Sequence, residues 1–110
     1  MQKIEITLDQ EQLRTINTMM NILISVPFEG QPRHRKSMLA ICLELQEFLL
    51  KKTIEKRHSK KAFRLKMPYY KADALWYFLD HFHDFFNFAP ESYEENVWRM
   101  IHSDLHKKLL

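Results

Sequence analysis

Two short segments of the chain, residues 3–8 and 63–67, alternate apolar and polar side chains. The apolar positions are Ile4, Ile6 and Leu8 in the first segment and Phe63, Leu65 and Met67 in the second. A period of two residues is typical of a β-strand with one buried face. Because a two-stranded ribbon is only marginally stable in water, we expect the strands to pair and the helices to cover their apolar face.

Four longer segments repeat apolar residues with the period of an amphipathic helix. The expected helices run from about Gln10 to Val26, from near Arg35 at least to Ile54, from about Tyr70 to Phe88, and from Pro90 towards the C-terminus. Ahead of the first helix, Asp9 followed by Gln12 fits an N-cap with its reciprocal partner. Prolines and the only glycine, between residues 27 and 32, mark the loop after this helix.

The second helix is apolar over more than half of its circumference. At about 100° per residue, its apolar side chains fall in two neighbouring arcs. The first arc holds Met38, Ile41, Cys42, Leu45, Phe48 and Leu49, and the second holds Leu39, Leu43, Leu50 and Ile54. We therefore expect this helix to be central and packed on two sides, with Glu47 and Lys51 as an ion pair on its narrow polar side.

Each strand segment precedes a helix, a break that contains proline, and a further helix. An offset of 59 residues aligns Ile4 with Phe63, Ile6 with Leu65, and Leu8 with Met67. The pattern predicts an α+β fold, predominantly helical, with four amphipathic helices and a small two-stranded β-ribbon in a pseudo-repeated β-α-α/β-α-α order. We expect residues 1–110 to form a single compact domain with halves of about 1–60 and 61–110.

The composition is that of one small globular domain. Of the 110 residues 45% are hydrophobic, enough for a single modest core. The lone Cys42 has apolar neighbours and is expected to be a buried, unreactive thiol. No apolar stretch approaches the roughly 20 residues that span a bilayer, so we expect a soluble, cytoplasmic protein with no membrane role.

Charge is unevenly distributed along the chain. The net charge of +3 is the sum of −1 in residues 1–50, +8 in residues 51–71 and −4 in residues 72–110. The basic segment holds nine Lys or Arg against Glu55 alone, and a smaller basic cluster, residues 33–36, precedes it. The acidic third segment is able to neutralise the basic one within the fold, so the overall charge is weak evidence for a polyanionic partner.

A cationic surface beside aromatic side chains is one way to hold a nucleic-acid backbone. The phosphate-binding candidates are Lys51, Lys52, Lys56, Arg57, Lys60, Lys61, Arg64 and Lys66, with Tyr69 and Tyr70 as candidates for stacking on bases. No helix-turn-helix, zinc-knuckle or RNA-recognition pattern surrounds them, and a charge run is more often a solvated face. Whether the 33–36 cluster joins this surface depends on the fold.

Histidine and acidic side chains occur together, but their spacing does not favour a metal site. His81 and His83 are about 200° apart on a helix and cannot chelate one ion together. His102 and His106 share a helix face, but the adjacent Arg99 disfavours a bound cation. We therefore expect no metal and no other cofactor.

Catalytic patterns are also missing from the chain. A single glycine excludes a glycine-rich phosphate-binding loop, and no serine lies in a glycine-flanked nucleophile turn. We expect no catalytic residue and no small-molecule substrate. A site assembled from residues that are distant in sequence is not visible in such patterns.

The sequence therefore favours a non-catalytic protein-protein interaction or assembly module, whose partner is another protein or a second copy of the chain. Apolar residues at the margins of the expected helix arcs are the candidates for an exposed contact patch, namely Phe88, Trp98 and Leu110. The alternative is a nucleic-acid-binding protein that uses residues 51–71. A metal-dependent enzyme is the third and least favoured function.

Overall fold

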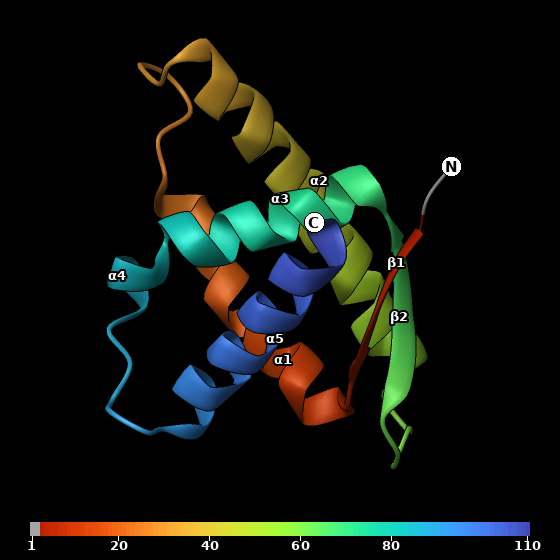
Figure 1. Ribbon diagram of the computed structural model, residues 1–110. Helices are drawn as coiled ribbons and strands as arrows, with labels where there is room; N and C mark the ends of the chain where they lie inside the picture. The colour runs from red at the N-terminus through yellow and green to blue at the C-terminus, as the bar shows by residue number, and fades with distance from the viewer. Residues whose placement is uncertain (1–2) are drawn as a thin grey trace.

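The computed structural model describes residues 3–110 (Figure 1). Along the chain the elements are β1 (Lys3–Leu8), α1 (Gln10–Met20), the 3-10 helix η1 (Asn21–Ser25), α2 (Arg33–Glu55), β2 (Phe63–Pro68), α3 (Tyr69–His81), α4 (His83–Phe86) and α5 (Tyr93–Leu109). The described residues thus form a predominantly helical α+β fold with a two-stranded sheet, as the sequence predicts.

The two strands pair in antiparallel orientation, with Ile6 opposite Leu65 and their apolar side chains buried in the core. The other face of the ribbon is charged. There Glu5 lies opposite Lys66, and Glu5 Oε1 is 3.6 Å from Arg64 Nε. Helices α3 and α5 contact the strands. They supply the core that an isolated two-stranded ribbon lacks.

The strand register places Ile6 opposite Leu65, one of the residue pairs that the 59-residue offset aligns. Two strand segments related by a two-fold axis would pair in this way. The helices differ more, since α2 has 23 residues and α5 has 17. The β-α-α/β-α-α repeat order is therefore not confirmed and stays a prediction.

The first helix begins at its expected cap. Asp9 Oδ1 accepts a hydrogen bond from the Gln12 N–H at 2.8 Å, and the Gln12 side chain accepts one from the Asp9 N–H at 2.8 Å. The α-helix ends at Met20, and η1 continues the apolar face as far as Leu23. A capping box satisfies two backbone donors that the first turn otherwise leaves open.

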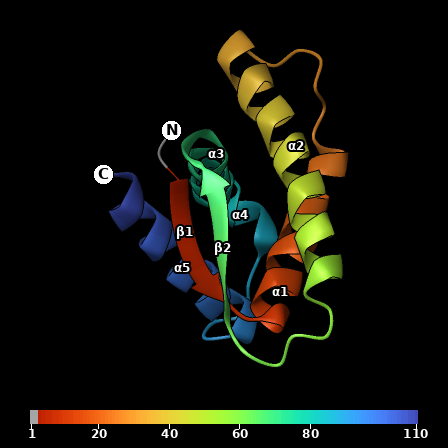
Figure 2. The same ribbon diagram turned by 90° about the vertical axis from the view of Figure 1, so that its right-hand side faces the viewer.

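Helix α2 differs from the expected central helix. Only one face of it is buried, through Leu39, Cys42, Leu45 and Leu49. Most of the second apolar arc is exposed, including Leu43, Leu50 and Ile54. The prediction of packing on two sides is wrong, because helical periodicity shows that an arc is apolar but not that another element covers it. The N-terminal half of α2 projects beyond the other helices (Figure 2).

The third helix is shorter than expected, because α3 ends at His81 instead of continuing to Phe88. The chain breaks at Phe82, forms the short α4, and leaves it through Asn87 in the left-handed conformation. Phe82 still reaches the core, but Phe85 is 64% exposed. No proline or glycine marks this break, so periodicity alone predicts one continuous helix.

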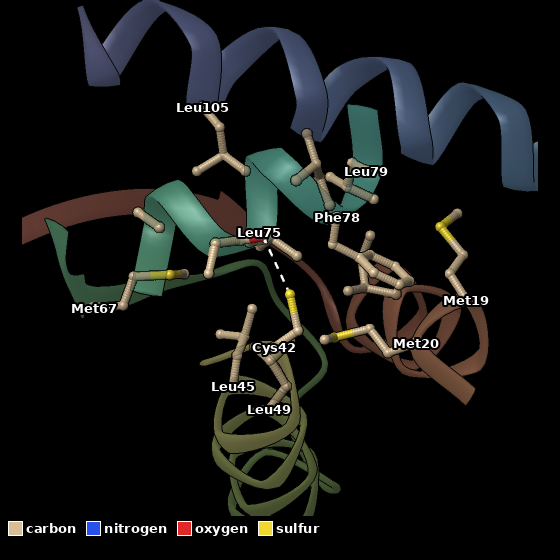
Figure 3. Close-up of a cluster of buried hydrophobic side chains, with 14 of the residues drawn as sticks. Met19, Met20, Cys42, Leu45, Leu49, Met67, Leu75, Phe78, Leu79 and Leu105 are labelled. Atoms are coloured by element: carbon tan, nitrogen blue, oxygen red, sulfur yellow. Dashed lines mark hydrogen bonds between the residues drawn. The ribbon is translucent and has the colours of Figure 1, made fainter. Parts of the chain in front are cut away.

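Helix α3 is the central element of the core. Its Leu75, Phe78 and Leu79 lie between α5, represented by Leu105, and side chains of α1 and α2 (Figure 3). The Phe78 and Phe82 rings stack with centroids 5.1 Å apart. Offset aromatic pairs of this kind add to the free energy of burial.

Phe78→Ala should lower the free energy of unfolding by about 3–5 kcal/mol, because it removes a fully buried ring from the centre of the core. Phe85→Ala deletes the same atoms from an exposed position and should cost less than about 0.5 kcal/mol. Urea unfolding followed by circular dichroism measures both values. Equal losses at the two positions would contradict this placement of the rings.

Candidate interaction surfaces

An exposed apolar stripe runs along α2. It consists of Ala40, Leu43, Leu50 and Ile54 together with Glu47, and we call it the α2 stripe. Leu43, Leu50 and Ile54 are 47%, 46% and 60% exposed. The intervals between its residues are three or four, which is the spacing of a helix-pairing seam.

Charged side chains accompany the α2 stripe. Glu47 Oε1 lies 3.3 Å from Lys51 Nζ, which confirms the expected ion pair, and Glu44 is exposed on the same side of the helix as Lys51. Exposed pairs of this kind contribute at most about 1 kcal/mol to stability. Charges that lie beside an apolar seam can instead set the orientation in which a second helix packs.

Part of the basic 51–71 segment is engaged within the protein. Lys52 Nζ lies 3.2 Å from Glu55 Oε2, and Lys56 Nζ lies 5.3 Å from the centroid of the Phe63 ring. The Arg57 guanidinium donates to the Ile54 carbonyl at 3.0 Å. These contacts fix side chains at the end of α2, although they leave the charges close to water.

The remaining cations of the candidate set are open to solvent. Lys60, Lys61 and Lys66 are exposed, and none of them has an ion-pair partner within residues 3–110. Arg64 is exposed on the outer face of the ribbon, with Glu5 as its partner. The free positive charge of the candidate set thus lies on Lys60 and Lys61 before β2 and on Lys66 within it.

The two tyrosines lie apart from these lysines. Tyr69 and Tyr70 follow Pro68, at the opposite end of β2 from Lys61, so the strand separates them by about 17 Å. The Tyr69 hydroxyl donates to the Leu109 carbonyl at 2.8 Å, and Tyr70 is exposed. The candidate residues therefore do not form one compact site in a single chain.

The acidic side chains of α3 do not pair with the basic segment in the described part of the chain. Asp80 Oδ1 instead lies 3.1 Å from His102 Nε2. The 33–36 cluster lies at the opposite end of α2 from the 57–61 turn, about 34 Å away at 1.5 Å per residue. The positive charge of one chain is thus divided between two ends of one helix.

His102 lies in an aromatic cluster that joins α3 to α5. Its ring stacks between Trp98, at 4.7 Å, and Trp76, at 5.7 Å, measured between centroids. The Trp98 indole N–H donates to the Leu79 carbonyl at 2.8 Å. The contact of His102 with Asp80 joins residues that are 22 apart in sequence, so local residue spacing does not predict it. Its geometry indicates packing between the two helices.

The other sequence-level metal candidates are also separated. The His83 ring lies tilted against Trp98 with centroids 4.2 Å apart, whereas the His81 ring stacks on Tyr77. Within residues 3–110, no three His, Cys, Asp or Glu side chains are grouped so as to hold a metal ion.

The candidate contact residues have different surroundings. Phe88 and Trp98 are partly buried against the core, and Leu110 is 92% exposed at the end of the chain. Phe88 also lines a groove of about 490 Å³ between α1 and the segment that follows α4, together with Met19, Ile22 and Phe85. Phe88 and Trp98 both lie against the His83 ring, at 5.9 and 4.2 Å between centroids, whereas Leu110 is at the end of the chain.

No family model, curated protein or solved structure matches this chain. None of the helices in the described part of the chain combines the length and the apolar character needed to cross a membrane.

Cys42 is buried on the inner face of α2, as expected. Its thiol faces the Ala74 carbonyl at 3.7 Å (Figure 3). Burial raises the pKa of this thiol from 9.0 to about 12. The thiolate is the reactive form, so the folded protein should protect Cys42 from alkylation.

At pH 8 the higher pKa lowers the thiolate fraction of Cys42 about a thousandfold relative to the unfolded chain, so iodoacetamide should modify the native thiol very slowly. Mass spectrometry measures the extent of Cys42 alkylation in the native protein and in the protein unfolded in roughly 6 M guanidinium. A Cys42→Ala, Ile24→Cys variant places the thiol at an exposed position and should react rapidly. Rapid native labelling of Cys42 itself would contradict its burial.

Proposed function

We propose that this protein is a non-catalytic assembly module that pairs with a second copy of itself through the α2 stripe. The observation that carries the proposal is the exposure of Leu43, Leu50 and Ile54 at helix-pairing intervals. Three large apolar side chains aligned on one exposed helix face are costly to leave in water. A second helix with the same spacing would bury them.

An antiparallel pair of α2 helices brings Leu43 of each copy against Ile54 of the other. With Leu43 of one copy against Ile54 of the other, Leu50 falls against Glu47. Glu44 then lies beside Lys51 of the second copy, and the two-fold axis repeats this pair of opposite charges. Such flanking charges set the orientation of paired helices.

A parallel pair would be less favourable. Each residue would then face its own counterpart, so that two Glu47 carboxylates would meet in the middle of the seam. Like charges at that distance repel and lose solvation. The charge pattern of α2 therefore selects the antiparallel arrangement of two copies.

The expected dimer is weak. A stable interface buries about 1,200–2,000 Å² in total, and one stripe of half-exposed side chains lies at the low end of that range. We therefore expect a dissociation constant of about 1–100 μM. Dimer and monomer should exchange at accessible protein concentrations.

Leu50→Glu should abolish the dimer, because the new carboxylate would face Glu47 of the second copy in the seam. Sedimentation velocity over a concentration series of roughly 1–300 μM, chosen to bracket the expected dissociation constant, measures the change. Phe85→Glu introduces the same charge at an exposed apolar residue on α4 and should leave dimerisation unchanged. A wild-type protein that stays monomeric throughout this range would refute the proposal.

Lys51→Glu should weaken the dimer about tenfold, because the new carboxylate would face Glu44 of the second copy. Adding Glu44→Lys exchanges the two charges and should restore most of the affinity in the antiparallel pair. The same sedimentation series measures the wild type and both variants, together with Glu44→Lys alone. If the double variant is weaker than either single variant, the copies are not paired in the antiparallel register.

A further inference from the structure

The two basic clusters lie at opposite ends of α2 in one chain, and antiparallel pairing would bring them together. In the register that joins Leu43 to Ile54, residues 33–36 of one copy extend past the end of α2 of the other, at the end where its 57–61 turn lies. We propose that the dimer binds double-stranded nucleic acid through the two composite basic surfaces formed in this way. This inference rests on the proposed self-pairing of α2.

The side chains at each surface are suited to phosphate. Arg33 and His34 are exposed at the start of α2, and Arg57, Lys60 and Lys61 are exposed in the turn after it. The Lys36 ammonium lies 5.8 Å from the centroid of the exposed Phe28 ring, which leaves it at the surface. Arginine and lysine bind phosphate oxygens and release the condensed counterions.

The spacing of the two surfaces matches a double helix. They are separated by the length of α2, about 34 Å at 1.5 Å per residue. One turn of duplex DNA repeats at about 34–36 Å, so one face of a duplex presents its backbone to both surfaces. The two-fold axis of the dimer also matches the local two-fold symmetry of a duplex backbone. A single strand offers no such fixed repeat.

Repulsion between the basic clusters of the two copies would make dimerisation depend on bound nucleic acid. Self-pairing places like charges of residues 33–36 and 57–61 side by side, which opposes association at low salt. Phosphates between these charges relieve the repulsion. Because linked equilibria are reciprocal, a duplex should strengthen dimerisation by the same factor by which dimerisation strengthens duplex binding.

The contacts available are to the phosphate backbone and not to base edges. The structure offers no separate recognition helix beside these clusters in residues 3–110. Tyr69, one of the stacking candidates, is hydrogen-bonded to the end of α5 and lies away from Lys60 and Lys61. Binding should therefore depend on duplex shape and salt and show little sequence preference.

The test is fluorescence anisotropy of a labelled 30-base-pair DNA duplex of roughly three helical turns, titrated with the intact protein at about 50 and 150 mM salt. Wild type should bind, with affinity falling at least about tenfold between the two salt concentrations. The double variants Arg33→Glu/Lys36→Glu and Lys60→Glu/Lys61→Glu should each weaken binding by about tenfold or more. Lys107→Glu/Lys108→Glu makes the same change of charge on α5 and should have little effect.

Three further outcomes separate this inference from the proposed function. Leu50→Glu, expected to be monomeric, should lose duplex binding with its cationic side chains intact, and wild-type affinity in that variant would overturn the composite surface. A wild-type dimer that binds no duplex at about 50 mM salt would overturn this inference and leave self-pairing intact. A single strand of the same length that binds as tightly as the duplex would also overturn it.

Discussion

The pairing of β1 with β2 is the constraint from which the arrangement of the other elements follows. It joins the start of the chain to a segment about sixty residues later, with Ile6 opposite Leu65. Two strands alone are marginal in water, so the ribbon persists only because α3 and α5 lie on its apolar face. The chain between Leu8 and Phe63 must therefore leave the ribbon and return to the same end of it.

The return path is longer than the outward one. Helix α1 has 11 residues and η1 has five, which span about 26 Å together. The 23 residues of α2 span about 34 Å. The excess projects beyond the other helices and carries residues 33–36 away from the ribbon (Figure 2). Helix α2 is buried on its inner face only, which leaves most of its second apolar arc in water.

Local chemistry explains what the sequence could predict. The two strands, the capping box at Asp9 and the burial of Cys42 each depend on residues that are close in sequence, and the structure confirms them. The break at Phe82 and the contact of Asp80 with His102 depend on tertiary packing and have no local signal. Periodicity identified the second arc of α2 correctly as apolar, but it contains no information about what covers that arc. The intervals of three and four residues in the α2 stripe, with Glu47 at the centre, are the sequence feature on which the proposed pairing rests.

The position of Glu47 also bears on the kind of partner that the α2 stripe would bind. In a helix face destined for the interior of one chain, a carboxylate at the centre of the apolar positions would have to be buried, at a cost of several kcal/mol unless it were paired. In the antiparallel pair proposed above, the same carboxylate lies against Leu50 of the second copy and keeps its contact with Lys51. A charge at one seam position lowers the affinity of two helices while it excludes the parallel alternative. The composition of the α2 stripe therefore suits the reversible self-pairing that we propose.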